Sequence, residues 1–117
     1  MNTIAVFLIA FVAFEHVYFL ILEMFLWTTP RGIKAFGLKS KAHAEDTKIL
    51  AANQGLYNGF LAIGLLLSLF DSDLKMAVFL LICITVAGIY GAYTTKKIKL
   101  LYIQAVPAIL ALAAILI

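Results

Sequence analysis

Charged side chains are scarce in this sequence. Asp, Glu, Lys and Arg make up only 13% of its 117 residues, whereas 65% of the residues are hydrophobic. Soluble globular domains usually contain about 25% charged residues. The composition therefore excludes a soluble domain and predicts an all-α integral membrane protein. The length allows one domain, residues 1–117, and no separate soluble module.

Cysteine and histidine are almost absent too. Cys83 is the single cysteine, so no intrachain disulfide can form, and we expect it to be a small helix-packing residue. The sequence contains no nucleophile elbow, phosphate-binding loop, HExxH or CxxC motif, and nothing in it supports nucleic-acid binding. We therefore expect no metal site, and the sequence indicates no particular cofactor and leaves open whether the protein is an enzyme.

Long apolar segments are what the sequence has in abundance. About 20 apolar residues suffice to cross a membrane as a helix. The first segment has no basic residues before it and no small-x-small cleavage pattern after it, so we expect a retained helix and not a signal peptide. We predict a bundle of four transmembrane helices, joined after the first by a cytoplasmic loop over residues 28–46. The predicted helices are Thr3–Trp27, Thr47–Phe70, Met76–Thr94 and Leu100–Ile117.

The basic residues predict how the helices cross the membrane. Of the nine Lys and Arg residues, all but Lys75 lie in or beside the first and third loops, which fall on one side of a four-helix hairpin bundle. Cytoplasmic loops are enriched in Lys and Arg. We therefore expect a multi-pass protein of the bacterial plasma membrane with both termini outside. The eight residues are Arg31, Lys34, Lys39, Lys41, Lys48, Lys96, Lys97 and Lys99.

Glu15 and His16 lie in the middle of the first apolar segment. An ionisable group at the centre of a bilayer costs about 2.5–3.5 kcal/mol on insertion scales, and such groups are functional by default. Glu15 is therefore a candidate proton carrier, general base or ligand anchor, and His16 is a candidate proton shuttle. The alternative for Glu15 is a protonated carboxyl bonded to Asn58 or a tyrosine. A metal held by Glu15, His16 and Glu23 is a weaker alternative, because no second membrane histidine exists.

The other polar side chains gather in the predicted cytoplasmic half, and the outer half is almost wholly apolar. Polar groups in a membrane face protein or a water-filled cavity. We predict a pocket, open to the cytoplasm, for a small lipophilic or amphipathic molecule. The alternatives are interhelical hydrogen bonds for the amides and an interfacial ion pair from Glu23 to Arg31 or a loop lysine. The predicted lining residues are Glu15, His16, Glu23, Asn53, Gln54, Tyr57, Asn58, Tyr90 and Gln104, with Glu15 and His16 as catalytic candidates.

Two small-x-x-x-small motifs predict close contacts between helices. They are Gly55-x-x-x-Gly59 and Ala87-x-x-x-Gly91. Small residues let helix backbones approach closely in membranes. The contacts are expected within a protomer or between protomers of a homo-oligomer, a dimer or a trimer.

Several motifs across most of the chain resemble domain of unknown function family 1304, whose members are small four-helix membrane proteins. This resemblance implies the fold and no activity. The residues that carry it are Glu15-His16, Glu23-Met24-Phe25-Leu26-Trp27, Thr29-Pro30-Arg31, Phe36-Gly37 and the stretch from Leu50 to Phe60, LAANQGLYNGF.

The architecture is also similar to that of the MAPEG proteins, membrane-associated eicosanoid and glutathione enzymes that are trimers of four-helix protomers. Their second-helix motif runs Arg-Ala-x-x-Asn-x-x-Glu-Asn. Ala51 and Asn58 match it, Gln54 and Tyr57 replace Asn and Glu, and Leu50 replaces the arginine. Without that arginine, the likeness is one of architecture, which does not establish function.

Two further functions remain open. Small multidrug resistance transporters resemble this chain in length, helix number and a glutamate in the first helix, so a proton-coupled exporter that uses Glu15 is one alternative. The apolar outer half offers such an exporter no polar path across the membrane. A structural or assembly subunit, with a polar face that binds a partner, is the other alternative.

Overall fold

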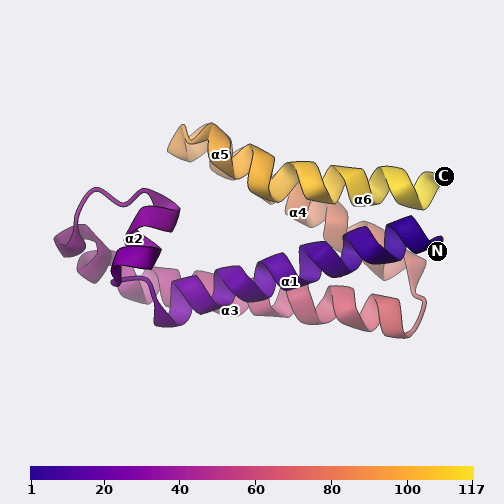
Figure 1. The fold of residues 1–117 in the computed structure, drawn as a ribbon, viewed down its shortest axis with the longest axis horizontal. Helices are drawn as coiled ribbons and strands as arrows, with labels where there is room; N and C mark the ends of the chain where they lie inside the picture. The colour runs from indigo at the N-terminus through magenta and orange to yellow at the C-terminus, as the bar shows by residue number, and fades with distance from the viewer. The chain divides into compact units, whose positions relative to one another are not determined.

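The computed structural model describes all residues, 1–117, and contains only helices (Figure 1). The absence of any strand confirms the predicted all-α class. In chain order the elements are α1 (Thr3–Phe25), α2 (Pro30–Phe36), α3 (Lys41–Phe70), α4 (Leu74–Thr95), α5 (Ile98–Leu100), the π-helix η1 (Leu101–Ala105) and α6 (Val106–Leu116).

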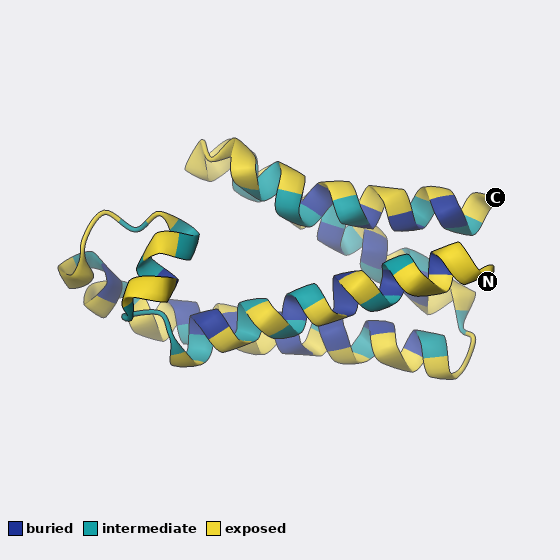
Figure 2. Cartoon of the chain, in the orientation of Figure 1, coloured by how far each residue is buried: buried dark blue, intermediate teal, exposed yellow.

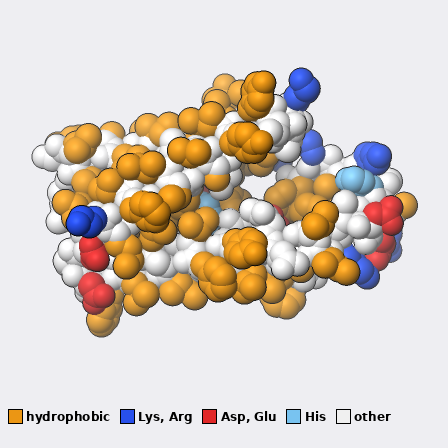
Figure 3. Space-filling model, turned by 180° about the vertical axis from the view of Figure 1, so that it is seen from behind, with side chains coloured by type: hydrophobic (Ala, Val, Ile, Leu, Met, Phe, Trp, Pro, Cys, Tyr) orange, Lys and Arg blue, Asp and Glu red, His pale blue; other side chains and the backbone are white.

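Four helical stretches are long and apolar enough to cross a membrane. They are Thr3–Phe25, Lys41–Phe70, Leu74–Thr95 and Ile98–Leu116, the last of which runs through α5, η1 and α6. Large hydrophobic side chains such as Phe7 and Phe14 are exposed on them. Figure 3 shows hydrophobic side chains over most of the visible surface, whereas most charged side chains gather toward the two sides of the view. Such surfaces suit lipid chains, which confirms the prediction of an integral membrane protein.

The segment between the first two spanning helices is more helical than the sequence pattern indicated. We expected a loop over residues 28–46 in which Lys41–Lys48 could form a helical entry to the second spanning helix. The structure begins α3 at Lys41 and also forms α2 within this segment. Thr29 caps the start of α2 by accepting a hydrogen bond from the Gly32 N–H, and Gly37 ends the helix in the left-handed conformation (φ 60°). Ser40 caps α3 by accepting from the His43 N–H at 3.0 Å.

The chain divides into two compact units, and residues Glu15–Ala62 form one of them. In this unit α1 and α3 run antiparallel and approach closely at two glycines. A Cβ atom added to Gly55 would lie 2.6 Å from Met24 Cγ, and one added to Gly59 would lie 2.6 Å from Leu20 Cδ1. The first small-residue motif therefore serves a contact within the protomer.

Residues Met1–Phe14 and Ile63–Ile117 form the other unit. Here α4 approaches η1 closely at Gly88, where an added Cβ would lie 2.8 Å from the Ala105 nitrogen. The predicted motif Ala87-x-x-x-Gly91 is not this close contact. Ala87 is exposed, and a Cβ on Gly91 would meet only Leu100 Cδ1, at 3.8 Å.

The last spanning stretch accommodates a proline by widening its helix. Pro107 has no N–H to donate, so it removes one bond of the helical pattern. Just before it, the Val106 N–H bonds to the Leu101 carbonyl, closing the π-turn of η1. Beyond the proline, α6 buries alanines that recur every third residue: Ala108, Ala111 and Ala114 (Figure 2).

The two chain ends lie together in this unit. Asn2 accepts from the Ala5 N–H at 2.8 Å through Oδ1, which caps the start of α1. Its Nδ2 donates to the Ala114 carbonyl at 2.7 Å. The Asn2 side chain therefore caps the start of α1 and also links α1 to α6 by a hydrogen bond.

Candidate functional site

A buried hydrogen bond joins the two helices of the 15–62 unit. Asn58 Nδ2 on α3 donates to Glu23 Oε1 on α1 at 2.5 Å, and the two residues are only 5% and 7% exposed. Gly55 makes this approach possible, because its missing Cβ would lie 3.1 Å from Glu23 Cβ. Glu23 therefore pairs with an amide, and the ion pair with Arg31 or a loop lysine does not form.

His16 lies on the same buried face of α1 as Glu23, since residues seven apart in a helix share a face. Its side chain is fully buried. The imidazole packs edge-on against Phe19, with ring centroids 5.1 Å apart. The imidazole therefore lies inside the protein and not on its outer surface.

One carboxyl oxygen of Glu15 has no hydrogen-bond donor in the structure. The residue as a whole is half-buried, but Oε1 is shielded from solvent and no group of the protein donates to it. The partner suggested by the sequence, Asn58, donates to Glu23 instead. A buried polar atom left without a partner costs about 1–3 kcal/mol.

Other predicted lining residues of α3 point outward. Asn53, Gln54 and Tyr57 are exposed, and Asn53 Nδ2 donates to the Ile49 carbonyl of its own helix at 2.9 Å. The spacing grouped Gln54 with Asn58 on one face. Four residues leave about 40° of rotation between two side chains. In the structure this rotation separates an exposed Gln54 from an Asn58 that faces α1.

Tyr90 and Gln104 belong to the other unit, on α4 and η1. Tyr90 is exposed and Gln104 is half-buried. Of the nine predicted lining residues, the structure joins only Glu23 and Asn58, by a hydrogen bond. His16 lies on the same face of α1 about two turns away, and Glu15 is its neighbour in the sequence. We call Glu15, His16, Glu23 and Asn58 the α1–α3 polar cluster.

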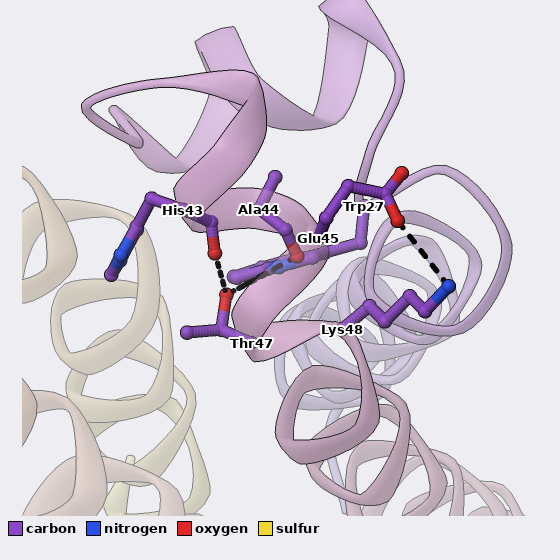
Figure 4. A network of polar contacts seen from close by, with 6 residues as sticks. All are labelled: Trp27, His43, Ala44, Glu45, Thr47 and Lys48. Carbon is purple, nitrogen blue, oxygen red and sulfur yellow. Dashed lines mark hydrogen bonds and ion pairs between the residues drawn. The ribbon is translucent and has the colours of Figure 1, made fainter.

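A second polar network, which the sequence pattern did not reveal, joins the ends of α1 and α3 (Figure 4). The Trp27 indole N–H donates to Thr47 Oγ1 at 3.0 Å, and the Thr47 hydroxyl donates to the His43 carbonyl at 2.8 Å. The sequence signal that could have indicated this bond is Trp27 itself, because a buried indole N–H usually has an acceptor. The network holds the start of α3 beside the end of α1.

Possible metal ligands do not converge in the structure. No group of three or more His, Cys, Asp or Glu side chains is placed to hold a metal ion. Glu15, His16 and Glu23 come from one helix, and the second histidine, His43, lies near the start of α3. The weaker alternative of a metal held by these three residues gains no support from the geometry.

Sequence comparison decides the family of the chain. The profile of the family described as "Protein of unknown function (DUF1304)" matches residues 10–116. The chain belongs to this family. It is also similar to "Uncharacterized protein YpaA" of Lactococcus lactis subsp. lactis (strain IL1403), with 32% identity over 115 residues that cover 96% of each protein. No solved structure matches the chain.

Membership of the DUF1304 family confirms the resemblance drawn from the motifs of α1 and α3. The match begins within α1, before Glu15, and reaches the end of α6, so the α1–α3 polar cluster lies inside it. The relative is bacterial, which agrees with a bacterial membrane protein. Neither match names an activity.

Proposed function

We propose that this DUF1304 protein binds a small lipophilic or amphipathic molecule within the membrane, at the α1–α3 polar cluster. The observation that carries the proposal is Glu15 Oε1, which is shielded from solvent midway along a spanning helix and accepts no hydrogen bond from the protein. Membranes offer no water to satisfy such an atom. A ligand hydroxyl, amide or amine would supply the missing donor.

The other members of the cluster support this role in different ways. The bond from Asn58 to Glu23 fixes the spacing of α1 and α3 about two helical turns along α1 from Glu15. His16, which follows Glu15 in the sequence, provides a fully buried imidazole. If the bound molecule is transformed, Glu15 and His16 are the groups that would move a proton.

The exposed polar residues of α3 support the proposal that the protein is an oligomer. Asn53, Gln54 and Tyr57 are exposed on a helix that spans the membrane, where lipid chains provide no hydrogen-bonding partners. We propose that they face another copy of the chain in a dimer or trimer, so that they reach the ligand from a neighbouring protomer.

Removing the Glu15 carboxylate should release the bound molecule. We expect wild-type protein, purified in mild detergent, to retain a non-protein compound that native mass spectrometry detects, and the Glu15→Leu variant to retain about tenfold less. The expected size follows from a buried ligand group that loses its hydrogen-bond partner, which costs about 1–3 kcal/mol, where about 1.4 kcal/mol corresponds to a factor of ten. The same spectra count the protomers in the complex, for which we expect two or three.

Phe14→Leu is the matched control, since Phe14 precedes Glu15 on α1 and is exposed. It should retain the compound at the wild-type level. Equal retention in all three proteins would contradict binding at Glu15. Proton release on adding the compound, lost in Glu15→Gln, would instead indicate the proton-coupled exporter.

We further propose that the chain lies in the plasma membrane with both termini outside and residues 28–46 in the cytoplasm. The bias of Lys and Arg toward the first and third loops supports this orientation. In a Cys83→Ser background, a membrane-impermeant maleimide should label Ile117→Cys in intact cells. It should label Lys39→Cys only after the cells are permeabilised. The reverse pattern would overturn the orientation.

A further inference from the structure

Arg31 on α2 is held against the spanning helix α1. Its Nε donates to the Tyr18 hydroxyl at 3.2 Å, and its guanidinium carbon lies 5.8 Å from the centre of the Tyr18 ring. Tyr18 lies about 10 Å along α1 from Phe25, at a rise of about 1.5 Å per residue. The arginine therefore reaches back along the flank of the helix, toward the membrane, and not into the surrounding water.

The helix that carries Arg31 is firmly seated on the end of α1. Gly32 is buried, and a Cβ added to it would lie 2.9 Å from Trp27 Cα. Phe36 packs against Trp27, with ring centroids 4.9 Å apart. Because Gly32 and Phe36 face the protein, Arg31 and Lys34, which are three residues apart, are exposed together on the other side.

The charges around Arg31 leave it without an acidic partner. The structure contains one ion pair, between Lys48 and Glu45 at 3.3 Å. Residues 30–48 hold five basic side chains and two acidic ones, Glu45 and Asp46. The terminal nitrogens of Arg31 accordingly meet no carboxylate.

We propose that Arg31 and Lys34 bind the phosphate of an anionic phospholipid where α1 leaves the membrane. Arginine presents a planar fork that suits a phosphate, and its Nε bond to Tyr18 fixes the direction of that fork. In the proposed orientation this surface faces the cytoplasmic leaflet, which is rich in anionic lipids. A signal for membrane orientation needs only positive charge and would not need a guanidinium fixed on a tyrosine.

The test is lipid competition on the full-length protein. Protein in detergent is mixed with equal amounts of phosphatidylglycerol and phosphatidylcholine of the same chain length, and native mass spectrometry counts the retained lipids. We expect wild type to prefer phosphatidylglycerol and Arg31→Gln to lose about tenfold of that preference, the size expected for the loss of one charge-assisted hydrogen bond. Arg31→Lys, which keeps the charge but loses the fork, should lose most of it too.

Lys39→Gln is the control, because it removes one exposed charge from the same segment without touching Tyr18. Its preference should change less than Arg31→Lys. An unchanged preference in Arg31→Lys, or an equal loss in Lys39→Gln, would overturn the site. Displacement of the lipid by inorganic phosphate would overturn the choice of a lipid as ligand. Unchanged Trp27 fluorescence in each variant would show that α2 remains seated.

Discussion

Replacing Asn58 by leucine is expected to lower the free energy of unfolding by about 1–3 kcal/mol, because it strands the buried Glu23 carboxyl without its donor. Loss of an average interhelical hydrogen bond in a membrane costs only about 0.6 kcal/mol. The larger value is expected here because both side chains are almost completely buried. Unfolding in mixed micelles with increasing dodecyl sulfate measures the difference.

Thr94→Leu is the control, since it introduces the same residue on α4 at an exposed position whose side chain bonds only to its own helix. It should change stability by no more than about 0.5 kcal/mol. Removing the stranded group as well, in Glu23→Leu combined with Asn58→Leu, should recover part of the loss. Equal effects of Thr94→Leu and Asn58→Leu would contradict a buried Glu23–Asn58 bond.

Substituting Gly32 by alanine is expected to unseat α2. The new Cβ would lie 2.8 Å from the Leu26 carbonyl carbon and 2.9 Å from Trp27 Cα, and these backbone atoms cannot move aside as a flexible side chain would. Overpacking of this kind costs about 1–3 kcal/mol, and occasionally more. Trp27 is the only tryptophan, so its fluorescence reports the loss of the Phe36 contact directly.

We expect the Trp27 emission of Gly32→Ala to shift toward longer wavelengths, and trypsin to cleave faster at Arg31 and Lys34. Gly91→Ala adds the same atom where the nearest neighbour would be Leu100 Cδ1 at 3.8 Å, so it should leave both readouts unchanged. Wild-type fluorescence in Gly32→Ala would mean that α2 does not pack on Trp27.

The spanning helices were predictable from the sequence and a helical entry over Lys41–Lys48 was indicated, whereas α2 and the contacts that hold the first turns of α3 were not. Long apolar runs identify spanning segments by length alone. Residues 41–46 have no such run, and their helix depends on the Ser40 cap and on the bond from Trp27 to Thr47. The first is a contact between a side chain and the backbone, and the second joins residues that are distant in the sequence. A hydropathy pattern reports neither kind of contact.

The members of the polar cluster were predictable, but their pairing was not. Counting residues placed Asn58 at the depth of Glu15, and the structure pairs it with Glu23 instead. The offset arises where Gly55 packs against Glu23 and Met24, which sets how far α3 slides along α1. The outward direction of Gln54 and Tyr57 follows from the same packing, because the glycine face of α3 is the one that meets α1.

The most direct test of ligand binding at the α1–α3 polar cluster is an experimental structure of the protein in native lipid. We expect non-protein density within hydrogen-bonding distance of Glu15 Oε1, next to His16. Protein side chains packed tightly around Glu15, with a protein group donating to Oε1 and no non-protein density beside it, would contradict the proposed function.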